Sequence, residues 1–69
     1  MKMKYDPKVD AMYIELSKGR YNRTKKISES ILVDEDSKGK ILGIEILDAK
    51  KNITAFDPKK PNFIVQTAQ

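Results

Sequence analysis

The segment from Asp34 to Glu45 has the residue spacing that comes closest to a metal site. Counted from Asp34, it places Asp at the first and third positions, Gly at the sixth and Glu at the twelfth, as in a calcium-binding EF-hand loop. The fifth position should supply an oxygen ligand but is Lys38, and the flanking residues alternate like strands, whereas the loop needs helices. We therefore predict a turn with Gly39 at positive φ, and no metal site.

Other residues that could do acid–base chemistry are carboxylates near turns or between apolar neighbours. Asp6 and Asp10 flank Pro7 and could form an acid–base or metal pair, but such residues more often cap turns. Glu45 lies among apolar residues, where burial would raise its pKa, or it faces outward and pairs with a lysine across the sheet. The chain has no histidine and no cysteine, so the usual base, nucleophile and zinc ligands are missing. We predict no catalytic residue, no cofactor and no enzymatic activity.

Length and charge limit the fold and the partners. With 69 residues the chain is expected to form one small domain, 1–69, with a thin apolar core. The net charge is +4, but only Arg20 and Arg23 among its 14 cations are arginines, the residues that best recognise phosphates and bases. Nucleic acid is therefore a possible but not a favoured partner. No apolar stretch is long enough to cross a membrane and the N-terminus lacks a secretory pattern, so we expect a cytoplasmic protein.

Alternating apolar residues predict strands at about 1–5, 11–17, 31–34 and 41–48. Turn-forming residues between the last two predict an antiparallel hairpin at about 31–47. Residues 21–26 are polar and carry no clear signal. One short helix is expected near 48–53, with Asp48 as its N-cap. The sequence thus predicts a mainly β (or small α+β) protein built as an antiparallel β-meander.

The expected strand at 41–48 has apolar residues on both faces and therefore belongs in the middle of a sheet. Strict alternation groups Leu42 with Ile44 and Ile46 on one face, opposite Gly43 and Glu45. Both faces need a cover, but prolines at 58 and 61 limit what the rest of the chain can build. Residues 62–67 could form a final strand or an apolar tail. We therefore predict a homodimer held by apolar surface.

Two motifs resemble those of the bacterial and archaeal family catalogued as domain of unknown function 2283. The first is Tyr5-Asp6-Pro7 followed by Asp10-Ala11-Met12-Tyr13-Ile14, and the second is Val33-Asp34 followed by Asp36, Gly39 and Gly43-Ile44-Glu45-Ile46-Leu47-Asp48-Ala49. The resemblance covers about residues 5–49 and leaves 53–69 as a C-terminal extension outside it. The family's motif positions, whose role the resemblance does not define, are Tyr5, Asp6, Asp10, Tyr13, Asp34, Gly43, Glu45 and Asp48.

The resemblance implies a small antiparallel β domain without an assigned activity. Members of the family are sometimes encoded beside a small putative toxin, which implies an antitoxin-like role with a small protein partner. From these considerations we expect a non-enzymatic protein-interaction module. The alternative is a nucleic-acid-binding module that uses the basic surface, and salt dependence separates the two, because phosphate contacts weaken steeply as salt rises.

Overall fold

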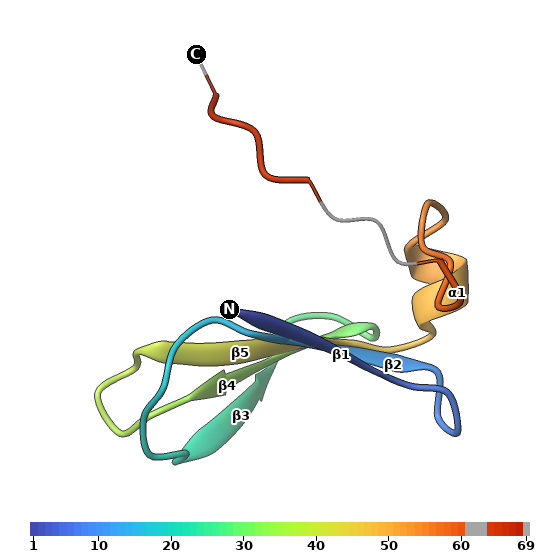
Figure 1. The fold of residues 1–69 in the computed structure, drawn as a ribbon. Coiled ribbons are helices and arrows are strands. Elements are labelled where there is room, and N and C mark those ends of the chain that lie inside the picture. Colours follow the sequence, from blue (N-terminus) through green and yellow to red (C-terminus); the bar gives the residue numbers. More distant parts are fainter. Residues whose placement is uncertain (61–63, 69) are drawn as a thin grey trace.

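A computed structural model describes residues 1–60 and 64–68 and consists of one antiparallel sheet with one short helix (Figure 1). This confirms the mainly β fold, the hairpin at 31–47, which is β4 and β5, and the short helix near 48–53, which is α1. The elements are β1 Lys2–Asp6, β2 Ala11–Glu15, β3 Arg23–Lys26, β4 Ile31–Glu35, β5 Ile41–Ile46 and α1 Ala49–Asn52.

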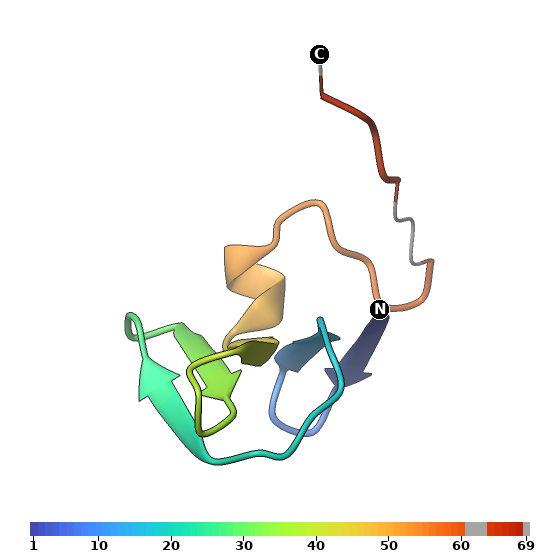
Figure 2. The ribbon, with the colours of Figure 1, turned by 90° about the vertical axis from the view of Figure 1, so that its left-hand side faces the viewer.

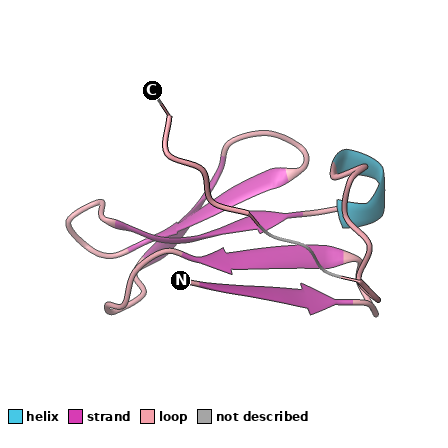
Figure 3. Cartoon of the chain, turned by 45° about the horizontal axis from the view of Figure 1, so that its top comes forward, coloured by secondary structure: helices cyan, strands magenta, loops and turns pink. Residues whose placement is uncertain are grey.

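The strand order is β1-β2-β5-β4-β3, so β5 lies in the centre, as its two partly apolar faces predict (Figure 3). The β-meander is correct only for β3, β4 and β5, because β2 and β3 are consecutive in the chain but not adjacent in the sheet. Instead β2 pairs with β5, which sets Met12 opposite Ile46 and Ile14 opposite Ile44. Pairing the two strands this way buries more apolar surface than pairing β2 with the polar β3 would.

Strand β3 is the element that the sequence analysis did not assign. All four of its residues, Arg23 to Lys26, are exposed, so they show no apolar alternation. The strand forms because it pairs with β4, where Lys25 lies opposite Val33 and Lys26 opposite Leu32. Exposed cationic residues suit an edge strand, since they discourage pairing with further strands.

The segment between β2 and β3 passes the end of the β4–β5 hairpin to reach the far edge of the sheet (Figure 2). The amides of Leu16 and Ser17 both donate to the carbonyl oxygen of Leu42, at 2.9 and 3.1 Å. The Ser17 hydroxyl donates to the carbonyl oxygen of Ile41 at 2.7 Å. These bonds fix the crossover against the start of β5.

An irregularity in the β4–β5 pairing changes which face Leu42 occupies. Gly43 lies opposite Asp34, but the next pair is Ile41 with Glu35, so Leu42 is an extra residue, as in a β-bulge. Leu42 is buried and lines a hollow with Tyr13 and Asp34, against the crossover. The predicted grouping of Leu42 with Ile44 and Ile46 is therefore wrong, because strict alternation fails at a bulge.

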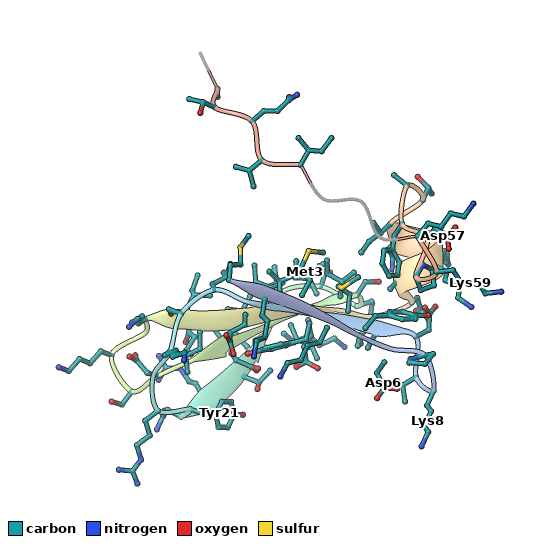
Figure 4. The ribbon with its side chains drawn as sticks, in the orientation of Figure 1. Met3, Asp6, Lys8, Tyr21, Asp57 and Lys59 are labelled. Atoms are coloured by element: carbon teal, nitrogen blue, oxygen red, sulfur yellow. The ribbon has the colours of Figure 1, made fainter. Side chains whose placement is uncertain are left out.

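One side of the sheet is almost entirely apolar. Directly paired residues point to the same side, and two rows cross the strands there. The first row is Met3, Ile14, Ile44 and Val33, and the second is Tyr5, Met12, Ile46 and Ile31. We call these eight residues the apolar face, and Figure 4 shows Met3 on the same side of the sheet as α1.

The segment that follows β5 covers only one end of the apolar face. Ala49 of helix α1 is fully buried. The ring of Phe56 packs edge to face against the ring of Tyr5, with 5.0 Å between the ring centroids. At the covered end Met12 is 2% exposed, whereas Met3 in the other row is 41% exposed. Over the described residues the protein is thus a single layer with a partial lid, whereas stable domains pack two layers.

The C-terminal strand that the sequence analysis considered for 62–67 is only partly within the described residues. Residues 61–63 and 69 lie outside them. Residues 64–68 form no helix or strand and are exposed, and this segment lies on the same side of the sheet as α1 (Figure 1). No helix in the part of the chain that the structure describes is long and apolar enough to cross a membrane.

Candidate functional site

The first group of motif residues, Tyr5, Asp6 and Asp10, organises the turn between β1 and β2. The carboxylate of Asp6 accepts a hydrogen bond from the Lys8 amide at 3.0 Å, which closes a local turn (Figure 4). Asp10 adopts a left-handed backbone with φ of 52°, and its carboxylate accepts the Tyr5 hydroxyl at 2.7 Å. The hydrogen bond to Asp10 raises the pKa of Tyr5 to about 12. Asp6 and Asp10 therefore cap turns, as their more common role suggested.

Asp10 also holds the start of α1. Its carbonyl oxygen accepts the Ala49 amide at 2.9 Å, and its carboxylate accepts the Lys50 amide at 3.2 Å, 40 residues along the chain. Asp48 occupies the N-cap position as predicted, but its φ is 48° and its side chain makes no cap bond. The predicted capping by Asp48 is therefore wrong, because its left-handed backbone turns the chain from β5 into α1 while Asp10 supplies the cap.

The second group of motif residues lies on the opposite, polar face of the sheet. Tyr13 on β2 extends across Gly43 on β5, so that a Cβ built on Gly43 would overlap the Tyr13 hydroxyl and ring. An aromatic ring over a strand glycine replaces the packing that the missing side chain would provide. Tyr13 and Gly43 thus form one packing unit that joins β2 to β5.

Substituting Gly43 by Ala is expected to lower the free energy of unfolding by about 1–3 kcal/mol, because the added methyl must displace the Tyr13 ring. A thermal or denaturant melt measures this. The same substitution in a Tyr13→Ala background should cost much less, since the ring is already gone. Equal costs in both backgrounds would show that Tyr13 is not what excludes a side chain at position 43.

Carboxylates surround Tyr13 at the centre of the polar face. Burial, and then the charges of Asp34, Glu15 and Glu45, raise the pKa of the Tyr13 hydroxyl. Glu45 lies between Tyr13 and Leu32 in the sheet, so the prediction that a lysine faces it across the ladder is wrong. The cations of this row, Lys4 and Lys26, stand at the edges because β1 and β3 are the edge strands.

The carboxylates of the polar face do not converge on a metal. The carboxylate of Asp34 accepts a hydrogen bond from the Thr24 hydroxyl at 2.7 Å. The same hydroxyl is hydrogen-bonded to the Tyr21 hydroxyl, also at 2.7 Å. An open hollow of about 420 Å³ is lined in part by Tyr13, Asp34 and Glu45. Among the residues that the structure describes, no group of three acidic, His or Cys side chains could hold a metal ion.

The segment that partly matches a calcium loop is a closed turn. Gly39 has φ of 83°, which confirms the predicted positive φ. The carboxylate of Asp36 accepts the amides of Lys38 and Lys40, both at 2.9 Å, and the amide of Gly39 donates to the carbonyl of Asp36 at 3.2 Å. The carboxylate that would have to bind calcium is thus already used by the turn.

Thermal melts recorded with millimolar calcium and with a chelator are therefore expected to coincide. A ligand that binds the native state alone must raise the melting midpoint, so a site would be visible as a shift. An Asp36→Ala variant, in contrast, should melt lower in both solutions, because it loses the turn's two amide bonds. A midpoint that rises with calcium in the wild type but not in this variant would contradict our interpretation.

One charged cluster was missed by the sequence analysis. Glu35 is buried and binds Arg23 at 2.9 Å and Lys25 at 3.6 Å, at the corner of the sheet beside the apolar face. In the sequence Glu35 stands between Asp34 and Asp36 and reads as part of a turn. Its alternation with Ile31 and Val33 is the signal that could have placed it on the strand.

The motif residues therefore form two structural groups, not one reactive centre. Tyr5, Asp10 and Asp48 shape the junction with α1, Asp6 closes the β1–β2 turn beside them, and the remaining four lie together on the polar face. A family model described as "Protein of unknown function (DUF2283)" matches residues 2–50, which include both groups. No curated protein and no solved structure showed a significant match to the chain.

Proposed function

Because the chain belongs to the DUF2283 family, whose description assigns no activity, we propose from its structure that it is a non-enzymatic protein-interaction module. The observation that supports this most strongly is the half-open apolar face. In its first row Met3 is exposed and Ile14 and Ile44 are only half-buried, whereas Val33 is buried. A contiguous apolar surface on so small a protein is typical of a binding site for another protein.

The roles of the motif residues support an interaction module over an enzyme. The carboxylates of Asp6 and Asp10 are engaged in turn and helix-cap bonds, as described above. The Tyr5 hydroxyl donates to Asp10 and is held protonated by that bond. Tyr5 and Asp6 line part of the open hollow that Tyr13, Asp34 and Glu45 also line, but the Tyr5 hydroxyl and the Asp6 carboxylate are already engaged in these bonds. An antitoxin-like role, in which the partner is a small toxin, would be one form of such a module.

Affinity capture from the native cell tests this proposal with two matched variants. Met3→Lys places a charge on the apolar face, whereas Val9→Lys makes the same change at an exposed residue of the β1–β2 turn, beside the polar-face hollow. Protein retained by the wild type and by Val9→Lys, lost with Met3→Lys, and resistant to nuclease and high salt is the expected result. Capture that is equal for all three forms would contradict it.

A nucleic-acid-binding role is the second candidate, and one surface favours it. A hollow of about 450 Å³ between the crossover and the β4–β5 turn is lined by Arg20, Tyr21 and Lys38, among others. A cation pair beside an exposed aromatic ring could contact phosphate and stack on a base. Tyr5 and Tyr13 lie on opposite faces of the sheet, however, so they do not combine with Tyr21 into a larger surface for stacking bases. Binding that falls steeply with salt and is lost with Arg20→Ala would favour this candidate.

A further inference from the structure

We propose that residues 64–68 of the chain itself close over the open end of the apolar face and compete there with a protein partner. This inference rests on the proposed function, because it concerns the regulation of the same surface. The segment lies on the α1 side of the sheet, and Figure 2 shows it toward the edge where β1 lies. Met3, the exposed member of the apolar face, belongs to that strand. The segment is therefore on the side from which the uncovered part of the face must be reached.

The composition of this segment suits an apolar contact. Ile64 and Val65 are 70% and 78% exposed, so most of their surface is free to be buried. The stretch 61–69 contains no charged residue, although 35% of the whole chain is charged. No ion therefore has to lose its hydration when the segment approaches the apolar face. Burial of the two aliphatic side chains there is favoured by the hydrophobic effect.

The residues that precede the segment are held at the covered end of the face. The ring of Phe56 packs against that of Tyr5. Asp57 then begins a β-turn with Pro58 at its second position, and the carbonyl oxygen of Asp57 accepts the Lys60 amide at 3.1 Å. Such a turn keeps its first and last Cα atoms within about 7 Å of each other. The chain therefore leaves this turn close to the Tyr5 end of the face.

The tether from this turn is long enough to reach the open row. Ile64 is four residues beyond Lys60, and four residues span at most about 14 Å. Met3 is two residues from Tyr5 along β1, which is about 7 Å, and its neighbour Ile14 lies about 4.8 Å further across the sheet. The segment can thus contact both residues without any movement of α1 or of the turn.

The contact is expected to be weak and therefore reversible. Two aliphatic side chains bury little surface, but a short tether holds them at an effective concentration in the millimolar range. We therefore expect closed and open forms of comparable population. A partner binds only the open form, so its apparent dissociation constant is raised by the inverse of the open fraction. Loss of the contact should tighten partner binding about two- to tenfold.

Methyl nuclear Overhauser spectra of the full chain test the contact itself. We expect cross-peaks between the methyl groups of Ile64 or Val65 and those of Met3 or Ile14, with relative intensities that do not change on dilution. Cross-peaks that weaken on dilution would come from a second copy, as in the homodimer that the sequence suggests. Their absence at every concentration would show that the segment does not cover the face. Either of these two results overturns the proposal.

Two matched double variants of the full chain test the competition. Ile64→Ser with Val65→Ser removes the apolar side chains, whereas Gln66→Ser with Thr67→Ser changes their polar neighbours, and neither pair alters the net charge. We expect the first variant to bind a neutral apolar dye more strongly than the wild type and to bind the captured protein about two- to tenfold more tightly. The second variant should behave like the wild type. All four residues are exposed, so the thermal transition should change little.

The outcomes separate this inference from the proposed function. If Met3→Lys abolishes capture while the Ile64→Ser and Val65→Ser changes alter neither capture nor dye binding, the face binds a partner without competition, and only this inference fails. If the same two changes weaken capture, the segment is part of the partner's binding site, which also overturns the competition. If no form captures a protein but the cross-peaks and the dye difference are present, the cover is supported and the proposed function fails.

Discussion

Substitution of Ile44 by Asp is expected to abolish the cooperative unfolding transition of this protein. Ile44 lies on the central strand and pairs with Ile14 on one side and Val33 on the other, in the middle of the apolar face. Ile44 is half-buried, so a carboxylate there loses part of its hydration without gaining a partner and also loses the apolar contacts with the neighbouring strands, which together cost several kcal/mol. Small domains have free energies of unfolding of about 5 kcal/mol or slightly more, so the variant should be largely unfolded at room temperature by circular dichroism.

The matched control for this prediction is Ile27→Asp, which makes the same change at a residue that is 62% exposed beyond the end of β3. Exposed substitutions usually change the free energy of unfolding by less than about 0.5 kcal/mol. Ile44→Val should cost about 0.5–1.5 kcal/mol, because it only removes a methyl group. A near-normal melt of Ile44→Asp would mean that the side chain of residue 44 does not lie in the apolar layer.

The second large effect is expected at Asp10. Substitution by Ala removes the carboxylate that accepts the Lys50 amide and caps α1. It also places an alanine, whose side chain makes no hydrogen bond, in a left-handed backbone conformation. Loss of a cap costs about 1 kcal/mol, and the left-handed conformation adds about 1–2 kcal/mol. A total of about 2–3 kcal/mol should appear in a denaturant melt. Amide exchange should also show that residues 49–53 lose protection first.

Two further variants separate the contributions of Asp10. Asp10→Gly keeps the left-handed backbone without strain and should cost less than Asp10→Ala, because only the side-chain bonds are lost. Asp10→Asn keeps an oxygen acceptor but removes the negative charge, so the pKa of Tyr5 should fall from about 12 toward its ordinary value of 10.0. If Asp10→Gly is as unstable as Asp10→Ala, backbone strain does not contribute.

The Tyr5–Asp10 bond also predicts the response of stability to alkaline pH. Because the pKa of Tyr5 is about 12 in the folded protein and 10.0 in the unfolded chain, the unfolded chain releases the proton first. The stabilisation is therefore complete below about pH 10 and is lost as the pH rises toward 12. Tyr5→Phe should have a flatter stability profile over this range, and an unchanged slope would contradict the assignment.

The sequence predicts the strands whose residues alternate and fails where distant residues decide the structure. The β4–β5 hairpin follows from local signals, namely two apolar runs around a turn that Gly39 closes. Strand β3 has no such signal, because the strand exists only through its pairing with β4. The face of Leu42 depends on a bulge between the pairs that Asp34 and Glu35 form with β5, which alternation alone does not predict.

The candidate site shows the same division. Its residues could be identified from the motifs, but their roles depend on contacts between distant segments. Asp10 caps a helix 40 residues away, and Gly43 is needed because Tyr13 of another strand lies over it. The sequence suggested Asp48 as the cap because it precedes the helix, and the local rule failed since its backbone is left-handed. Topology, not residue type, determines these roles.

The central claim is that the apolar face binds another protein molecule. Solvent paramagnetic relaxation of side-chain methyl groups tests this claim most directly. A soluble paramagnetic probe is added to methyl-labelled protein with and without the protein retained in the affinity capture. We predict that Ile14 and Ile44 become protected from the probe when that protein is added, while Leu32 on the polar face stays equally accessible. Unchanged accessibility of Ile14 and Ile44 in the complex would contradict the account.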